Sequence, residues 1–128
     1  MGWTRRNWMT FAALSGLLSV AFGAFAAHGL ADPQAKDWMR TGASYQAIHA
    51  LACFAAAAMM QMGSAGARLA PAFFLGGSLI FSGSLYAMAL GGSRVLGAVT
   101  PVGGVLLLIG WGLLTWAARG VDPPLRRE

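Results

Sequence analysis

Charged side chains are scarce in this chain. Lysine, arginine, aspartate and glutamate make up 10% of its 128 residues and hydrophobic residues 57%, whereas a soluble domain has about 25% charged residues. This shortage excludes an ordinary water-soluble protein, and the length fits a single domain. The basic residues stand at segment ends and do not alternate with aromatic side chains in a patch. We therefore expect no nucleic-acid binding.

Cysteine is almost absent. Cys53 is the only one, so an intrachain disulfide is impossible. It lies in an apolar run, where a lone cysteine usually behaves as a small hydrophobic side chain. A reactive thiolate would need a nearby cation, and His49, four residues earlier, is the one candidate for that role. We favour the structural interpretation of Cys53.

Familiar catalytic patterns are also missing. The sequence has no G-x-S-x-G, no G-x-x-x-x-G-K-[ST] and no H-E-x-x-H motif. Asp32 and Asp37 are too peripheral for paired acid–base chemistry, and the two histidines fall short of a metal-ligand set. The sequence predicts a protein that is not an enzyme, with no catalytic residues, no metal and no cofactor.

Long apolar segments are what the chain does contain. Each of four is about 20 residues long, and an α-helix of that length crosses roughly 30 Å of hydrocarbon. We predict an all-α, integral membrane four-helix bundle with short loops, forming one domain over residues 1–118. The helices are expected at about residues 8–27, 43–62, 69–90 and 96–118, and a flexible charged cytoplasmic tail at residues 119–128.

The first apolar segment imitates a secretory signal. Arg5 and Arg6 precede it, and Ala24-Phe25-Ala26 resembles a cleavage site. Against cleavage, the segment is long enough to span a membrane and carries a stripe of small residues of the kind that packs one membrane helix on another. We predict a retained helix. The residues predicted to lie at helix-packing interfaces are Ser15, Ser19, Gly23, Gly83 and Gly104.

A polar stretch separates the first two apolar segments. Asp32 and Pro33 suit the N-cap and first position of a helix. The mixed sequence from Gln34 to Arg40 predicts a short amphipathic helix lying at the membrane surface. Thr41-Gly42 is the expected joint between this interfacial helix and the second membrane helix.

The positive-inside rule predicts the orientation of the chain. On the side holding both termini and the middle turn, six basic residues lie near the helix ends: Arg5, Arg6, Arg68, Arg119, Arg126 and Arg127. The other side has three: Lys36, Arg40 and Arg94. Both termini are therefore expected in the cytoplasm.

With this topology, the polar side chains within the membrane gather in the outer half of the bundle. The candidate ligand-binding residues are His28, Tyr45, His49, Ser82, Ser84, Tyr86 and Thr100. Two interpretations stay open. The side chains either satisfy one another across the helices and fix their register, or they line an outward-facing pocket, since an intramembrane histidine is a default site candidate.

Several motifs resemble those of one family. They are Gly23-Ala24-Phe25-Ala26-Ala27-His28-Gly29-Leu30, Trp38 with Thr41-Gly42, Tyr45-Gln46-Ala47-Ile48-His49-Ala50-Leu51, Phe81-Ser82-Gly83-Ser84-Leu85-Tyr86, Thr100-Pro101-Val102-Gly103-Gly104 and Gly110-Trp111. In this order they resemble the small bacterial inner-membrane proteins called domain of unknown function 423, YgdD-like, which have a eukaryotic relative named transmembrane protein 256. The resemblance spans roughly residues 12–118. It implies a four-helix inner-membrane protein whose first helix is retained, and it implies no activity.

The sequence thus favours a small, non-enzymatic accessory or structural component of the inner membrane. Its expected partners are the lipid bilayer and a larger membrane protein or further copies of itself. The alternative is a lipid or small-molecule binding or transport module that uses the outer-half polar pocket.

Overall fold

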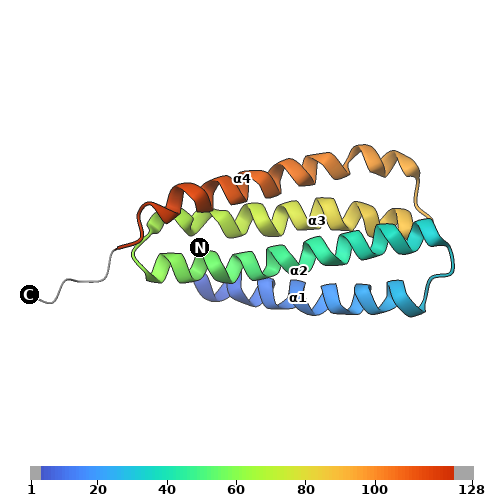
Figure 1. Cartoon of the computed structure of the whole chain (residues 1–128), viewed down its shortest axis with the longest axis horizontal. Coiled ribbons are helices and arrows are strands. Elements are labelled where there is room, and N and C mark those ends of the chain that lie inside the picture. Colours follow the sequence, from blue (N-terminus) through green and yellow to red (C-terminus); the bar gives the residue numbers. More distant parts are fainter. Residues whose placement is uncertain (1–3, 123–128) are drawn as a thin grey trace, which may run out of the picture.

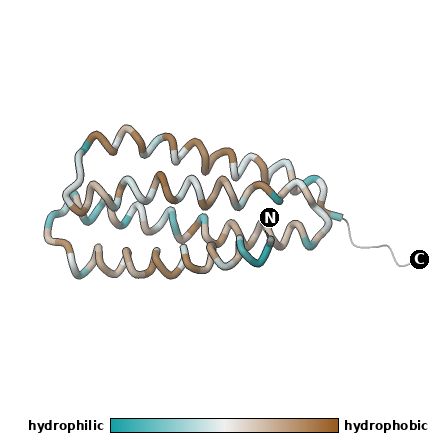
Figure 2. The backbone as a smooth tube through the Cα atoms, turned by 180° about the vertical axis from the view of Figure 1, so that it is seen from behind, coloured by the Kyte–Doolittle hydropathy of each residue, from teal (hydrophilic) through white to brown (hydrophobic). Residues whose placement is uncertain are grey.

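Four long helices joined by short turns make up the computed structural model, which describes residues 4–122 (Figure 1). The helices are α1 (Arg5–His28), α2 (Pro33–Gln61), α3 (Ala70–Ala89) and α4 (Thr100–Ala118), with short 3-10 helices η1 (Ala65–Leu69) and η2 (Arg94–Ala98) leading into α3 and α4. Within residues 4–122, four segments are long and apolar enough to cross a membrane. Figure 2 shows hydrophobic residues along most of their length. The predicted all-α bundle of four apolar helices is confirmed, whereas residues 123–128 of the predicted tail lie outside the described part of the chain.

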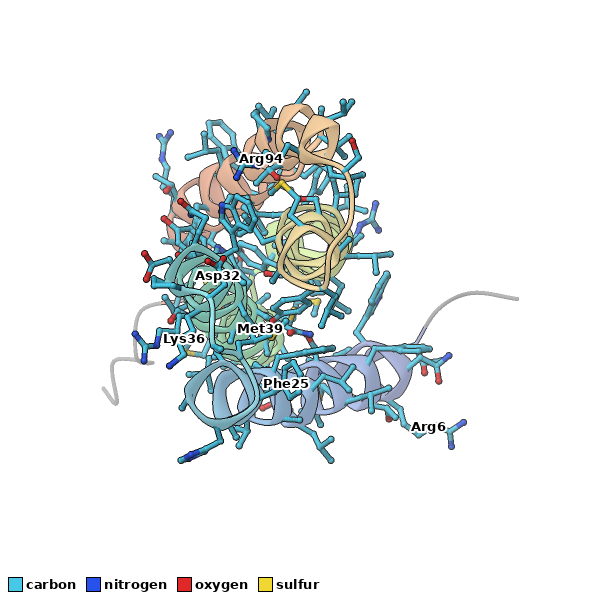
Figure 3. All side chains as sticks on the ribbon, turned by 90° about the vertical axis from the view of Figure 1, so that its right-hand side faces the viewer. Arg6, Phe25, Asp32, Lys36, Met39 and Arg94 are labelled. Carbon is cyan, nitrogen blue, oxygen red and sulfur yellow. The ribbon has the colours of Figure 1, made fainter. Side chains whose placement is uncertain are left out.

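The helices pack in the order of the chain. Helix α1 packs on α2, α2 on α3 and α3 on α4, while α1 and α4 share no contact within residues 4–122. Figure 3, viewed along the bundle, shows α1 and α4 at opposite edges with α2 and α3 between them. The two middle helices are therefore covered on two sides, and each edge helix on one.

One helix replaces the predicted interfacial helix and its joint. Helix α2 runs without interruption from Pro33 to Gln61, and its N-cap Asp32 accepts a hydrogen bond from the Ala35 amide at 2.9 Å. Ala35 and Met39 are buried in a cluster that also contains Ala26, Tyr86 and Ala89. The polar sequence of residues 34–40 is thus the first part of α2, with one side packed on α1 and α3. The prediction of a separate surface helix is wrong.

Gly42 is a packing residue within α2 and not a joint. A Cβ atom at this position would lie 2.6 Å from the Tyr86 ring of α3. The glycine leaves room for that ring, and the helix continues through it. True turns occur after α2 and α3, where Gly63 and Gly91 adopt a φ of 97°, a left-handed conformation that glycine accepts without steric cost.

Small residues bring α1 against α2. Ala12, Ser19 and Ala26, spaced by seven residues, are the buried positions of α1. A Cβ at Gly23 would lie 3.7 Å from Ala43, and Ser15 accepts a hydrogen bond from α2. The predicted packing residues Ser15, Ser19 and Gly23 therefore all lie on the side of α1 that faces α2.

Different glycines from those predicted bring α3 against α4. A Cβ at Gly77 would lie 2.7 Å from Leu107, and one at Gly110 would lie 2.5 Å from Phe74. By contrast, nothing lies within 4 Å of a Cβ at Gly83, and one at Gly104 would make an ordinary contact of 3.8 Å with Phe81. The close approach depends on Gly77 and Gly110, together with Gly103, and not on Gly83.

Gly103 gives a sharp test of this packing. A Cβ there would collide with the Phe81 backbone nitrogen and lie 2.8 Å from the Gly77 carbonyl oxygen. Because backbone cannot move aside as a side chain can, we expect Gly103→Ala to lower the free energy of unfolding in detergent by about 3 kcal/mol. Gly112→Ala is the matched control, since nothing lies within 4 Å of its Cβ, and it should stay within about 0.5 kcal/mol. Equal stability of the two variants would contradict the interface.

Candidate functional site

His49 is buried near the middle of α2 and both of its ring nitrogens are engaged. Its Nδ1 lies 2.6 Å from the Tyr45 carbonyl oxygen, and a carbonyl can only accept, so Nδ1 carries the hydrogen. Trp111 of α4 donates its indole Nε1–H to Nε2 at 3.0 Å. Both contacts suit the neutral imidazole in one fixed tautomer. The pair joins α2 directly to α4.

Aromatic rings surround this hydrogen bond. The Phe74 ring lies 5.6 Å from the His49 ring and 5.3 Å from the Trp111 ring, measured between centroids. Tyr45, one turn before His49, packs against Phe81 with centroids 4.6 Å apart. A groove of about 620 Å³ runs between α2 and α4 beside these rings. Its walls are apolar and aromatic, and Tyr45 is 43% exposed there.

Tyr86 of α3 belongs to a second group, which includes residues of α1 and α2. Its hydroxyl donates to Gln46 Oε1 at 2.7 Å, and Gln46 Nε2 donates to Ser15 Oγ at 3.2 Å. The Tyr86 ring stacks on Phe22 of α1 with centroids 4.1 Å apart. This chain of hydrogen bonds joins α1, α2 and α3.

The serines of α3 make the remaining links. Ser82 donates to the Gly42 carbonyl oxygen of α2 at 2.7 Å. The Ser84 hydroxyl lies 2.6 Å from the Thr100 hydroxyl at the start of α4 and 2.8 Å from the Phe81 carbonyl oxygen. Each of these hydroxyls is satisfied within the protein, as groups inside a bilayer must be.

The predicted site residues are therefore not gathered around one cavity. Tyr45 and His49 line the α2–α4 groove, whereas Ser82 and Tyr86 lie between α2 and α3. Ser84 and Thr100 pair at one end of the α3–α4 interface. His28 is the exposed last residue of α1. What most of these residues share is a hydrogen bond that crosses from one helix to another.

Two residues that form hydrogen bonds between helices are missing from the site residues predicted from the sequence. Gln46 bridges Ser15 and Tyr86, and Trp111 satisfies His49. The signal for Gln46 is an amide inside an apolar helix, where it needs partners. Trp111 has no such local signal, because its partner lies 62 residues away in the sequence. Within residues 4–122, no three His, Cys, Asp or Glu side chains come together in a way that could hold a metal ion.

Comparison with known proteins shows the family of this chain. Residues 22–104 match the family model described as protein of unknown function (DUF423). The chain belongs to the DUF423 family. The matched part includes Gln46, His49 and Tyr86 and ends within α4, whereas the partners Ser15 and Trp111 lie outside it.

Relatives in the DUF423 family align over most of their length. A UPF0382 membrane protein of Haemophilus influenzae is 46% identical over 110 residues, covering 84% of this chain and 89% of the relative. The UPF0382 inner membrane protein YgdD of Escherichia coli is 44% identical over 115 residues, covering 87% and 88%. YwdK of Bacillus subtilis, also a UPF0382 membrane protein, is 38% identical over 112 residues. No solved structure matches this chain.

These findings identify a multi-pass protein of the bacterial inner membrane with four candidate spans. The family resemblance predicted from the motifs is confirmed. The family description assigns no activity to its members.

The His49–Trp111 hydrogen bond can be measured by a double-mutant cycle. We expect a coupling free energy between Trp111→Phe and His49→Phe of about 0.6 to 1.7 kcal/mol, the range for interhelical bonds in membranes. The measurement is reversible unfolding of the four proteins in detergent. Trp116→Phe serves as the control partner, because Trp116 is 68% exposed and should show no coupling to His49. Coupling near zero for Trp111 would contradict the link between α2 and α4.

Proposed function

We propose that this protein is a non-enzymatic accessory or structural component of the bacterial inner membrane. The observation that carries the proposal is the pairing of the intramembrane polar groups with one another. Gln46 donates to Ser15, Tyr86 donates to Gln46, and Trp111 donates to His49. These hydrogen bonds hold the helices in register and leave few polar groups free to bind a ligand or to react.

His49 has no ring nitrogen free for acid–base chemistry. A general base or a proton relay needs a ring nitrogen that can take up a proton. The Nε2 of His49 already accepts the Trp111 hydrogen, and the Nδ1 hydrogen is directed to the Tyr45 carbonyl. Catalysis at His49 would therefore require breaking the link between α2 and α4. This cost favours a structural role.

Contact with another membrane protein would use the edges of the bundle. Helix α1 exposes Leu17 and Val20, which are 64% and 73% accessible, and α4 exposes Leu108 at 71%. In lipid, an apolar surface alone gives no strong drive to associate, so close packing would decide the affinity. We infer that a partner contacts one of these two edges.

The alternative function is binding or transport of a lipid or small molecule. It is favoured by the groove between α2 and α4, whose volume of about 620 Å³ lies in the range of ligand sites. Tyr45 is the polar residue most open to that groove, since His49 is 4% exposed. This makes the groove poor in available hydrogen bonds, and we therefore rank it second.

Native mass spectrometry of the protein released from its own membrane in mild detergent separates the two functions. We expect a stoichiometric complex with a different membrane protein, and loss of that complex when Leu17→Trp and Val20→Trp alter the α1 edge, or when Val102→Trp alters the α4 edge at a position that is 55% exposed and does not line the α2–α4 groove. Gln34→Trp, exposed at the polar end of α2, is the control. Finding only free monomer or self-oligomer would count against the accessory role. A retained small molecule that is lost with Tyr45→Phe would favour the alternative.

The proposed orientation places both termini in the cytoplasm, because six basic residues lie near that side and three near the other. Ala31 and Ala65 are exposed residues at opposite ends of the bundle. In a Cys53→Ala background, a membrane-impermeant maleimide should label Ala31→Cys at the bacterial inner membrane once the outer side is accessible. Ala65→Cys should react only after the membrane is disrupted. The reverse labelling pattern would mean that both termini lie on the outer side of the membrane.

A further inference from the structure

One buried hydroxyl stands apart from the satisfied polar groups. Ser78 of α3 is 5% exposed, and its Oγ is the one buried side-chain polar atom without a hydrogen-bond partner among the described residues. An unpaired hydroxyl in an apolar environment raises the free energy of the protein. Such a group calls for an explanation. The other serines of α3, Ser82 and Ser84, both have partners.

Ser78 lines a groove between α1 and α3. The groove has a volume of about 420 Å³ and lies on the side of α2 that carries Gln46. Leu14 and Leu18 of α1 form one wall, and Leu75 and Leu79 of α3 form the other. Its volume and apolar lining are typical of a small-molecule site, provided that a few polar groups converge on it.

Three polar side chains from three helices do converge there. Ser15 comes from α1, Gln46 from α2 and Ser78 from α3. The Gln46 amide uses its oxygen to accept from Tyr86 and one hydrogen to donate to Ser15. A primary amide has a second hydrogen. Gln46 Nε2 and the Ser78 hydroxyl can therefore each still donate a hydrogen bond.

The depth and charge of the groove restrict what could accept these hydrogens. Among the described residues that line the groove there is no lysine, arginine or histidine, so a phosphate or carboxylate would have no counter-charge from them in the hydrocarbon. Trp8, which also lines the groove, is of the residue type that is enriched at the membrane–water interface, and Ser15 lies seven residues further along α1, or roughly 10 Å along the helix axis. An ester carbonyl that stays beside a phospholipid headgroup would not reach that depth. A neutral molecule dissolved in the membrane would reach that depth.

We propose that the groove between α1 and α3 binds a neutral, membrane-dissolved carbonyl compound of the quinone type. Its carbonyl oxygen accepts hydrogen bonds from Ser78 and Gln46, and its ring and apolar tail lie along Leu14, Leu18 and Leu79. The groove shares no lining residue with the groove between α2 and α4, which Tyr45 and His49 line. This binding site goes beyond the accessory role and does not depend on it.

The test uses a matched pair of glycines on α3. Gly76 lines the groove and Gly83 does not, and a Cβ at either position meets nothing within 4 Å. Gly76→Leu should therefore fill the groove without disturbing the packing, and Gly83→Leu should leave the groove open. Size-exclusion chromatography and circular dichroism confirm that both variants are folded.

The measurement is photolabelling of the full chain in lipid nanodiscs with an azido-benzoquinone that carries a decyl chain. We expect saturable labelling of α1 and α3 peptides that falls at least tenfold in Gly76→Leu and is unchanged in Gly83→Leu. Ser78→Ala should weaken binding about fivefold, the effect of losing one hydrogen bond. Unlabelled decyl-benzoquinone should compete, whereas decylbenzene, which has the ring and chain but no carbonyl, should not.

Three results would overturn the proposal. Labelling that is not saturable, or that is equal in Gly76→Leu, would mean that the groove is not the site. Equal competition by decylbenzene would mean that the groove takes any apolar molecule. Unchanged affinity in Ser78→Ala would mean that the Ser78 hydroxyl does not bind the compound. None of these results bears on whether a partner protein is found, so the accessory role stands or falls separately.

Discussion

The requirement that polar groups within a membrane find partners inside the protein governs this fold. Water cannot satisfy a hydroxyl, an amide or an imidazole in hydrocarbon, so each must meet another helix or its own backbone. Gln46 meets Ser15 and Tyr86, and His49 meets Trp111. The side-chain hydrogen bonds thereby connect every helix to a neighbour. They specify which surfaces meet, a choice that apolar side chains alone leave open in lipid.

The same requirement explains the order of the helices across the bundle. Helices α2 and α3 carry most of the paired polar groups and are the two that are covered on both sides. Helix α1 contributes Ser15 to a link with its neighbour, and α4 contributes Thr100 and Trp111. A helix with more polar groups needs more neighbours. The two apolar edge helices can face lipid at little cost.

The sequence predicted the four apolar helices because twenty-residue apolar runs have few alternatives. It did not predict that residues 34–40 continue α2, since the amphipathic pattern of a surface helix and that of a helix packed on one side are the same. Which glycines lie between α3 and α4 depends on the helix crossing geometry, so Gly103 and Gly110 could not be told from Gly83. His49 could be picked out as a buried polar residue, but its pairing with Trp111 requires the tertiary structure.

The packing of each helix mainly on its neighbour in the chain has a consequence for biosynthesis. Because most contacts of each helix are with the helix before it in the chain, each new helix finds most of its docking surface on the helix inserted just before it. The pair α1–α2 can assemble while the rest of the chain is still being translated, and α3 and then α4 can add to it in turn. Such stepwise addition lets Gln46 meet Ser15 as soon as α1 and α2 pair, whereas His49 meets Trp111 only when α4 arrives.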